Sequence, residues 1–70
     1  MPNVTTYEAD CVRDGKFWVI TVKGLPGNST NVTQGFSRTE VRSMAIELIS
    51  LVTGNPESEI AVNITWAIGT

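Results

Sequence analysis

The chain changes from strands to a helix within residues 35–41, Gly-Phe-Ser-Arg-Thr-Glu-Val, and this change decides the fold. Ser37 is followed three residues later by Glu40, which is the spacing of a capping box. In this motif the serine oxygen accepts a hydrogen bond from the backbone N–H of Glu40. The Glu40 carboxylate reaches back to the N–H of Ser37. The motif predicts that a helix begins directly after Ser37.

Residues after the cap repeat with the period of an amphipathic helix. Apolar side chains recur at steps of three and four and form one stripe, which consists of Val41, Met44, Ala45, Leu48 and Val52. Gly54 follows as a residue suited to a left-handed helix end, and Pro56 prevents continuation. We therefore expect the helix to span residues 38–53.

The residues before the helix predict a β-hairpin and a short third strand. Strand-like runs at 5–12 and 17–23 flank Arg13-Asp14-Gly15-Lys16, and Asp-Gly between two such runs predicts a type I′ turn. The second run is apolar on both faces, which is typical of a central strand. A loop rich in Gly, Pro and Asn covers 24–31. Residues 32–34 then form a brief strand that closes on Gly35.

Residues 59–68 alternate strictly between larger apolar and smaller or polar side chains, as in a strand with one buried face. The element order is therefore β-β-β-α-β, an α+β fold. We expect a four-stranded mixed sheet in the order 3-2-1-4, with the last strand parallel to the first and the helix packed on one face. Seventy residues suffice for one domain, so residues 1–70 are taken as a single unit.

Composition excludes several classes of site. The chain has no histidine and one cysteine, Cys11, which excludes an internal disulfide, a Cys/His zinc site and histidine-dependent catalysis. The net charge of −2 disfavours a free-standing nucleic-acid-binding domain. No apolar run has the length of a membrane span, and the first residues do not have the pattern of a signal peptide. We therefore expect a cytoplasmic protein without cofactor, metal or membrane contact.

The order of the turn and cap motifs resembles the HicB-like antitoxin family. A hairpin turn precedes a Leu-Pro-Gly loop, a Thr-Gln-Gly segment and a capped helix with Glu in its first turn. The positions that carry this resemblance are Asp14, Gly15, Leu25, Pro26, Gly27, Thr33, Gly35, Ser37 and Glu40. Two features depart from the family pattern: residues 28–31 lengthen the loop, and Val41 stands where the family prefers Ala.

The resemblance implies a degenerate RNase H-like domain without the C-terminal DNA-binding part found in many members. It implies a non-enzymatic antitoxin of a toxin–antitoxin system, which neutralises a small basic RNA-cleaving toxin by steric occlusion. The alternative is an orphan or phage-encoded oligomeric protein that keeps the fold without a toxin partner. A neighbouring reading frame for a small basic protein would distinguish the two.

Two groups of residues are candidates for partner contacts. Glu8, Asp10 and Asp14 concentrate negative charge in the first strand and hairpin, which suits a basic partner but equally describes a solvated edge. One helix covers only one face of a four-stranded sheet, so the other face should expose apolar surface. We expect this surface to include Trp18, Ile20 and Val22. We expect it to be covered by another copy of the chain, by a toxin, or by both.

Catalytic and nucleic-acid-binding interpretations are weaker. A metal-dependent RNase H-like nuclease needs carboxylates on the first strand, the helix and the fourth strand. Asp10 and Glu40 or Glu47 supply only part of this set, so no catalytic residue is assigned. Cys11 is expected to be inert. Trp18 and Trp66 could stack on bases, but they are expected to lack surrounding Lys and Arg and to have a core or interface role, so no direct nucleic-acid contact is expected.

Overall fold

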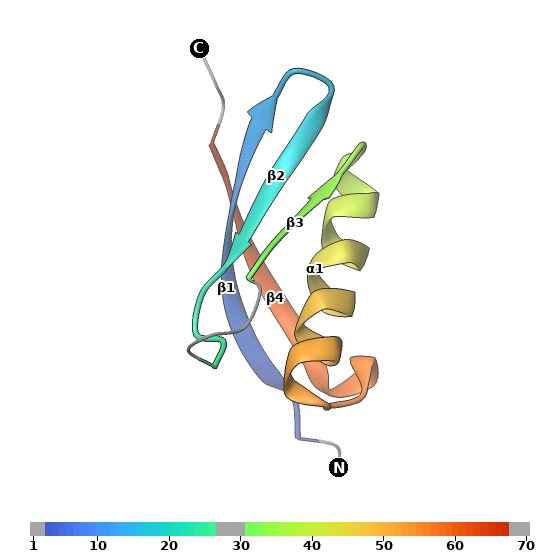
Figure 1. Cartoon of the computed structure of the whole chain (residues 1–70). Helices are drawn as coiled ribbons and strands as arrows, with labels where there is room; N and C mark the ends of the chain where they lie inside the picture. Colours follow the sequence, from blue (N-terminus) through green and yellow to red (C-terminus); the bar gives the residue numbers. More distant parts are fainter. Residues whose placement is uncertain (1–2, 27–30, 68–70) are drawn as a thin grey trace.

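The computed structural model describes residues 3–26 and 31–67. Its elements are β1 (Thr5–Asp14), β2 (Phe17–Val22), β3 (Val32–Gly35), α1 (Arg38–Thr53), the short 3₁₀ helix η1 (Glu57–Glu59) and β4 (Ile60–Ala67). The four strands form one mixed sheet in the order β3-β2-β1-β4, and α1 lies on one of its faces (Figure 1). The predicted α+β fold, element order and strand order are confirmed.

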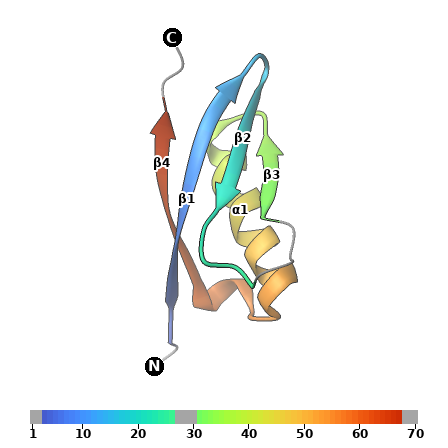
Figure 2. The same ribbon diagram turned by 60° about the vertical axis from the view of Figure 1, so that its left-hand side comes forward.

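Strand pairing places β1 and β2 at the centre of the sheet and β3 and β4 at its edges (Figure 2). β1 pairs antiparallel with β2 from Ala9↔Val22 to Asp14↔Phe17. β4 lies parallel to β1 from Thr5↔Ile60 to Val12↔Ala67, as predicted. Only β1 joins the last strand to the rest of the sheet.

The hairpin turn differs from the predicted one. Asp14 is the last residue of β1 and pairs with Phe17, so the two loop residues are Gly15 and Lys16. Gly15 has φ 62°, and no residue other than glycine has positive φ in the described part of the chain. A positive φ at the first central position alone is the pattern of a type II′ turn. The predicted type I′ turn centred on Asp14-Gly15 is therefore wrong.

The core lies between the sheet and one stripe of α1. Val41, Ala45 and Ile49 of the helix are fully buried. They pack with buried residues of three strands, which are Ala9, Cys11, Trp18, Ile20, Val22, Ile60 and Val62. The predicted stripe is correct at Val41 and Ala45 but misses Ile49. Met44, Leu48 and Val52 are only half-buried and flank the buried row.

Trp18, Ile20 and Val22 face the helix, with exposed fractions of 8%, 0% and 1%. The prediction that these three residues lie on an open contact surface is therefore wrong. A strand that is apolar on both faces gives no indication of which face the helix will cover. The helix covers the side that carries these bulky residues, and Phe17 and Val19 of β2 face the other way.

The ends of α1 follow the predicted chemistry. The Glu40 N–H donates to Ser37 Oγ at 3.2 Å. The Glu40 carboxylate accepts from the N–H of Phe36 at 3.0 Å, one residue before the predicted donor. At the other end Gly54 has φ 77° and its N–H donates to the carbonyl of Ser50. The predicted helix bounds, 38–53, match the observed ones.

Gly35 allows α1 to approach the sheet closely. A Cβ atom at this position would lie 3.2 Å from the backbone nitrogen of Val41 and 3.3 Å from its Cα. These are backbone atoms, which cannot move aside as a flexible side chain would. A glycine at the end of β3 therefore fits the first turn of the helix against the sheet.

The remaining predicted positions agree in part. β1 continues two residues beyond the predicted end, and η1 takes up Glu59 at the predicted start of β4. Leu25 is half-buried and packs against the core, Pro26 is exposed, and Thr33 is half-buried in β3. Gly27, most of the predicted loop insertion at 28–31, and Ile68 lie outside the described residues.

Replacing Ser37 by Ala should lower the free energy of unfolding by about 1 kcal/mol, because the Glu40 N–H loses its acceptor. Thermal or urea denaturation followed by circular dichroism measures this difference. Ser43→Ala is the matched control, because Ser43 is an exposed serine on the same helix. Equal stability of the two variants would contradict the capping role of Ser37.

Candidate functional site

The face of the sheet opposite α1, here called the outer face, carries the predicted acidic residues. Residues paired across strands share a face, so Glu8, Asp10 and Asp14 lie on the same side as Val19, Thr21 and Asn63. Lys23 Nζ lies 3.1 Å from an Asp10 carboxylate oxygen, and Asn63 Nδ2 donates to Glu8 at 3.1 Å. The three carboxylates and one ammonium leave a local charge of −2. The structure therefore brings the predicted acidic residues to one face, with one of them neutralised.

The end of the outer face near the hairpin is apolar. Phe17 and Phe36 pack together with ring centroids 5.0 Å apart, and Phe36 remains 65% exposed. We define the outer apolar patch as these two residues with three exposed or half-buried valines on the same face, which are Val12, Val19 and Val32. Val32 pairs with Thr21 and lies at the end of β3 away from the hairpin. A hollow of about 330 Å³ lies beside Val19 and Val32. This is the exposed apolar surface that the single helix predicts, formed by residues other than the predicted ones.

A second surface lies on the helix side, near the hairpin end of the sheet. The indoles of Trp18 and Trp66 meet edge to face at a centroid distance of 5.0 Å. The Arg13 guanidinium lies 5.3 Å from the Trp18 ring, and that of Arg38 lies 5.1 Å from the Trp66 ring and 5.9 Å from the Trp18 ring. We call these four residues, together with Arg42, the Arg–Trp patch.

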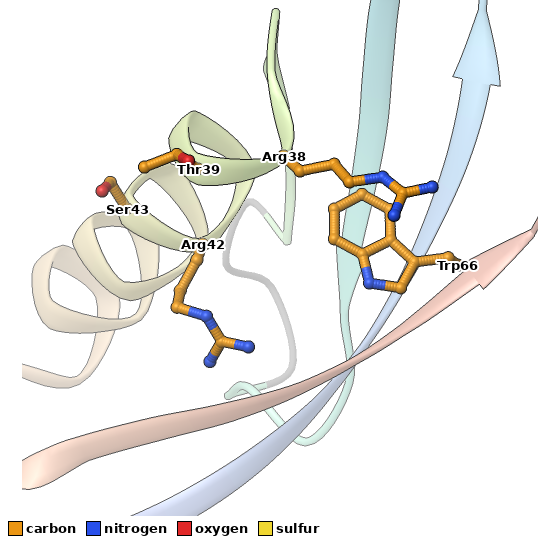
Figure 3. Close-up of a pocket in the computed structure, with 5 residues that line it drawn as sticks. All are labelled: Arg38, Thr39, Arg42, Ser43 and Trp66. Atoms are coloured by element: carbon orange, nitrogen blue, oxygen red, sulfur yellow. The ribbon is translucent and has the colours of Figure 1, made fainter.

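A groove of about 380 Å³ opens beside this patch, between the start of α1 and β4. Figure 3 shows the Arg38 side chain extending from the first turn of α1 across the indole of Trp66. Arg42, one turn later, extends toward the strands, where its Nη1 donates to the carbonyl of Val62 at 3.0 Å. Thr39 and Ser43 also line this groove, and their side chains lie farther from Trp66 than that of Arg38 (Figure 3).

The expectation that the two tryptophans lack basic neighbours is therefore wrong. Arg13 is brought to Trp18 by hairpin pairing, because the two residues are directly opposite each other. Arg38 is brought to Trp66 by the packing of α1 over the sheet. Neither residue is adjacent to its tryptophan in sequence. From the sequence, only a correct hairpin register could have predicted that Arg13 lies beside Trp18.

The carboxylates considered for metal-dependent chemistry are not brought together. Asp10 lies on the outer face, while Glu40 and Glu47 lie on the helix across the sheet. Within residues 3–26 and 31–67, no group of three or more His, Cys, Asp or Glu side chains is arranged to hold a metal ion. In the same part of the chain, no helix is long and apolar enough to cross a membrane.

Cys11 lies at the centre of β1 with an exposed fraction of 0%. Burial raises the pKa of its thiol, because desolvation disfavours the thiolate. The acidic neighbours Glu8 and Asp10 in the same strand face the opposite side of the sheet. Since the thiolate is the nucleophile, the site holds Cys11 in its unreactive form.

Comparisons with known proteins identify no relative of this chain. No protein-family model matches the chain, and searches of curated proteins and of solved structures find no similar protein. The resemblance to HicB-like antitoxins therefore depends on the motif order in the sequence.

The thiol of Cys11 should react with a disulfide reagent such as DTNB only as the protein unfolds. In native buffer we expect the reaction rate to follow the opening of the domain. In denaturant we expect the rate of a free thiol. Cys11→Ser should remove the reaction. Fast stoichiometric labelling of the folded protein would contradict the buried position.

The raised pKa of the Cys11 thiol also makes the free energy of unfolding depend on pH. The protonated thiol contributes to stability below the pKa of the unfolded state, and this contribution is lost as the pH rises through the pKa of the folded state.

Proposed function

We propose that this protein is a non-enzymatic protein-binding module that uses the outer face of its sheet. The observation that supports this proposal is the outer apolar patch, because α1 covers only the inner face. Contiguous exposed apolar surface on a small domain marks an interaction site. Aromatic residues such as Phe17 and Phe36 are also enriched at the centres of protein interfaces.

The carboxylates on the same face favour a basic partner. Glu8 and Asp10 lie away from the hairpin, and Asp14 lies beside Phe17 at the hairpin end. These three residues would attract positive charge toward the outer face, and the apolar patch would supply the contact area. Together with the motif resemblance, this arrangement supports an antitoxin that binds a small basic RNA-cleaving toxin and blocks access of RNA to it. Binding would be steric and would need no cofactor. A cytoplasmic location belongs to the same proposal.

Replacing Glu8, Asp10 and Asp14 by Gln, Asn and Asn should slow association with the basic partner and leave the fold intact. Charges at an interface rim act mainly on the association rate and are screened over ~8–10 Å at physiological ionic strength. The measurement is surface plasmon resonance at two salt concentrations, with the product of any neighbouring reading frame for a small basic protein as the partner. The matched control replaces Glu47, Glu57 and Glu59 by Gln, which removes three charges away from the outer face.

Co-expression tests the antitoxin proposal itself. If a neighbouring reading frame encodes a small basic protein that arrests growth, this chain should relieve the arrest, and the two proteins should be recovered as a complex at low salt. If arrest persists and no complex forms, the antitoxin proposal fails. If the control triple variant slows association as much as the outer-face variant, the partner binds elsewhere on the domain.

The second candidate function is an orphan or phage-encoded oligomeric protein, and the same patch favours it. A second copy of the chain could cover Phe17 and Phe36 by pairing outer faces about a twofold axis. Sedimentation equilibrium at micromolar concentrations should then show a dimer or larger species. Phe17→Ser with Phe36→Ser should yield the monomer, whereas Leu51→Ser should not, although Leu51 is 77% exposed on the helix. A wild-type monomer at all concentrations would contradict self-association.

A further inference from the structure

The Arg–Trp patch concentrates positive charge on a chain whose net charge is −2. Three of the five Lys and Arg residues, Arg13, Arg38 and Arg42, lie in it. Within the described residues, no carboxylate lines its groove. The outer-face carboxylates lie across the sheet. The patch therefore has a local potential opposite to that of the whole chain, and it is separate from the surface used in the proposed function.

The side chains in the patch have the chemistry that recognises a nucleotide. A guanidinium held over an indole keeps N–H donors for a phosphate oxygen, and its planar group can also stack on a base. Arg38 is exposed and lies over Trp66, which is itself half-buried at the rim of the groove. Arg42 uses one nitrogen for the carbonyl of Val62 and retains further N–H donors.

The shape of the patch distinguishes a single strand from a duplex. Reading duplex DNA requires an element that enters a groove, such as a helix or a two-stranded ribbon. Here two of the basic residues, Arg38 and Arg42, border a hollow of about 380 Å³ between α1 and β4, which can admit an unpaired base. Arg38 and Arg42 are four residues apart on one helix, which separates them by about 6 Å along the helix axis. This spacing allows the two guanidiniums to contact successive phosphates of one nucleic-acid strand.

We propose that the Arg–Trp patch binds single-stranded nucleic acid, with phosphates held by Arg13, Arg38 and Arg42 and one base seated in the groove beside Trp66. An acidic peptide would satisfy the guanidiniums but would leave the stacking surface unused. A single strand uses both the charge and the planar groups, which is the combination typical of single-strand binding surfaces.

The two tryptophans provide a direct readout, because Trp18 and Trp66 are the only tryptophans of the chain. Titration with a short oligothymidylate should quench their fluorescence, and anisotropy of a labelled strand should give the affinity. Three phosphate contacts on a single strand predict a slope of log K against log salt of about −2. Between about 50 and 200 mM salt the affinity should therefore fall roughly 15- to 20-fold.

Arg38→Gln is the test variant and Lys23→Gln the matched control, since Lys23 pairs with Asp10 on the outer face. Arg38→Gln should weaken binding by about tenfold, as expected for one lost charge-assisted hydrogen bond, and reduce the salt slope by about 0.7. Lys23→Gln should change affinity less than about twofold, because its charge lies outside the patch. Arg38→Lys should keep the slope but bind more weakly, because it retains the charge and loses the planar group.

Several results would overturn the proposal. These are absence of quenching at low salt, an equal loss of affinity in Lys23→Gln, equally tight binding of duplex DNA, and equally tight binding of polyglutamate. Circular dichroism establishes that each variant is folded, and Arg38→Lys serves as the test if Arg38→Gln is not. The outer-face variants of Glu8, Asp10 and Asp14 should not weaken strand binding, so this proposal and the proposed function can fail separately.

Discussion

A single helix of sixteen residues has to form the core with a sheet of four strands, and the rest of the molecule depends on that packing. Val41, Ala45 and Ile49 form its buried row, spaced four residues apart along one side of α1. The glycine at position 35 lets the first turn approach the sheet, since any side chain there would meet the backbone of Val41. The centre of the inner face is thereby removed from water, whereas the outer face must be stable in water or covered by another molecule.

Local signals in the sequence predicted the helix well, because both of its ends have specific chemistry. Ser37 with Glu40 marks its start, and Gly54 in a left-handed conformation marks its end. The buried row was harder to predict. Residues 44, 45, 46, 48, 49, 51 and 52 are all apolar, so more than one stripe fits the helical period. Only contact with the sheet selects Ile49. The same ambiguity affects β2, whose two apolar faces gave no indication of which would lie under α1.

The Arg–Trp patch was missed because of the turn. A loop centred on Asp14-Gly15 would pair Trp18 with Cys11, whereas the observed loop at Gly15-Lys16 pairs it with Arg13. The shift is two residues, so every side chain keeps its face and only its partner changes. Asp-Gly fits a type I′ turn and Gly-Lys fits a type II′ turn, so turn chemistry alone did not distinguish the two registers. The approach of Arg38 to Trp66 depends on the crossing of α1 over the sheet, which no local pattern encodes.

The parallel pairing of β1 with β4 has a consequence for synthesis on the ribosome. β1 is made first, but its neighbour on one side consists of residues 60–67. Until those residues have left the exit tunnel, one edge of β1 has unpaired backbone groups, and the core lacks Ile60 and Val62. The apolar side chains of the β1–β2 hairpin therefore remain partly hydrated until β4 is available. A domain this small, with its first and last strands adjacent, folds after translation of β4 rather than during it.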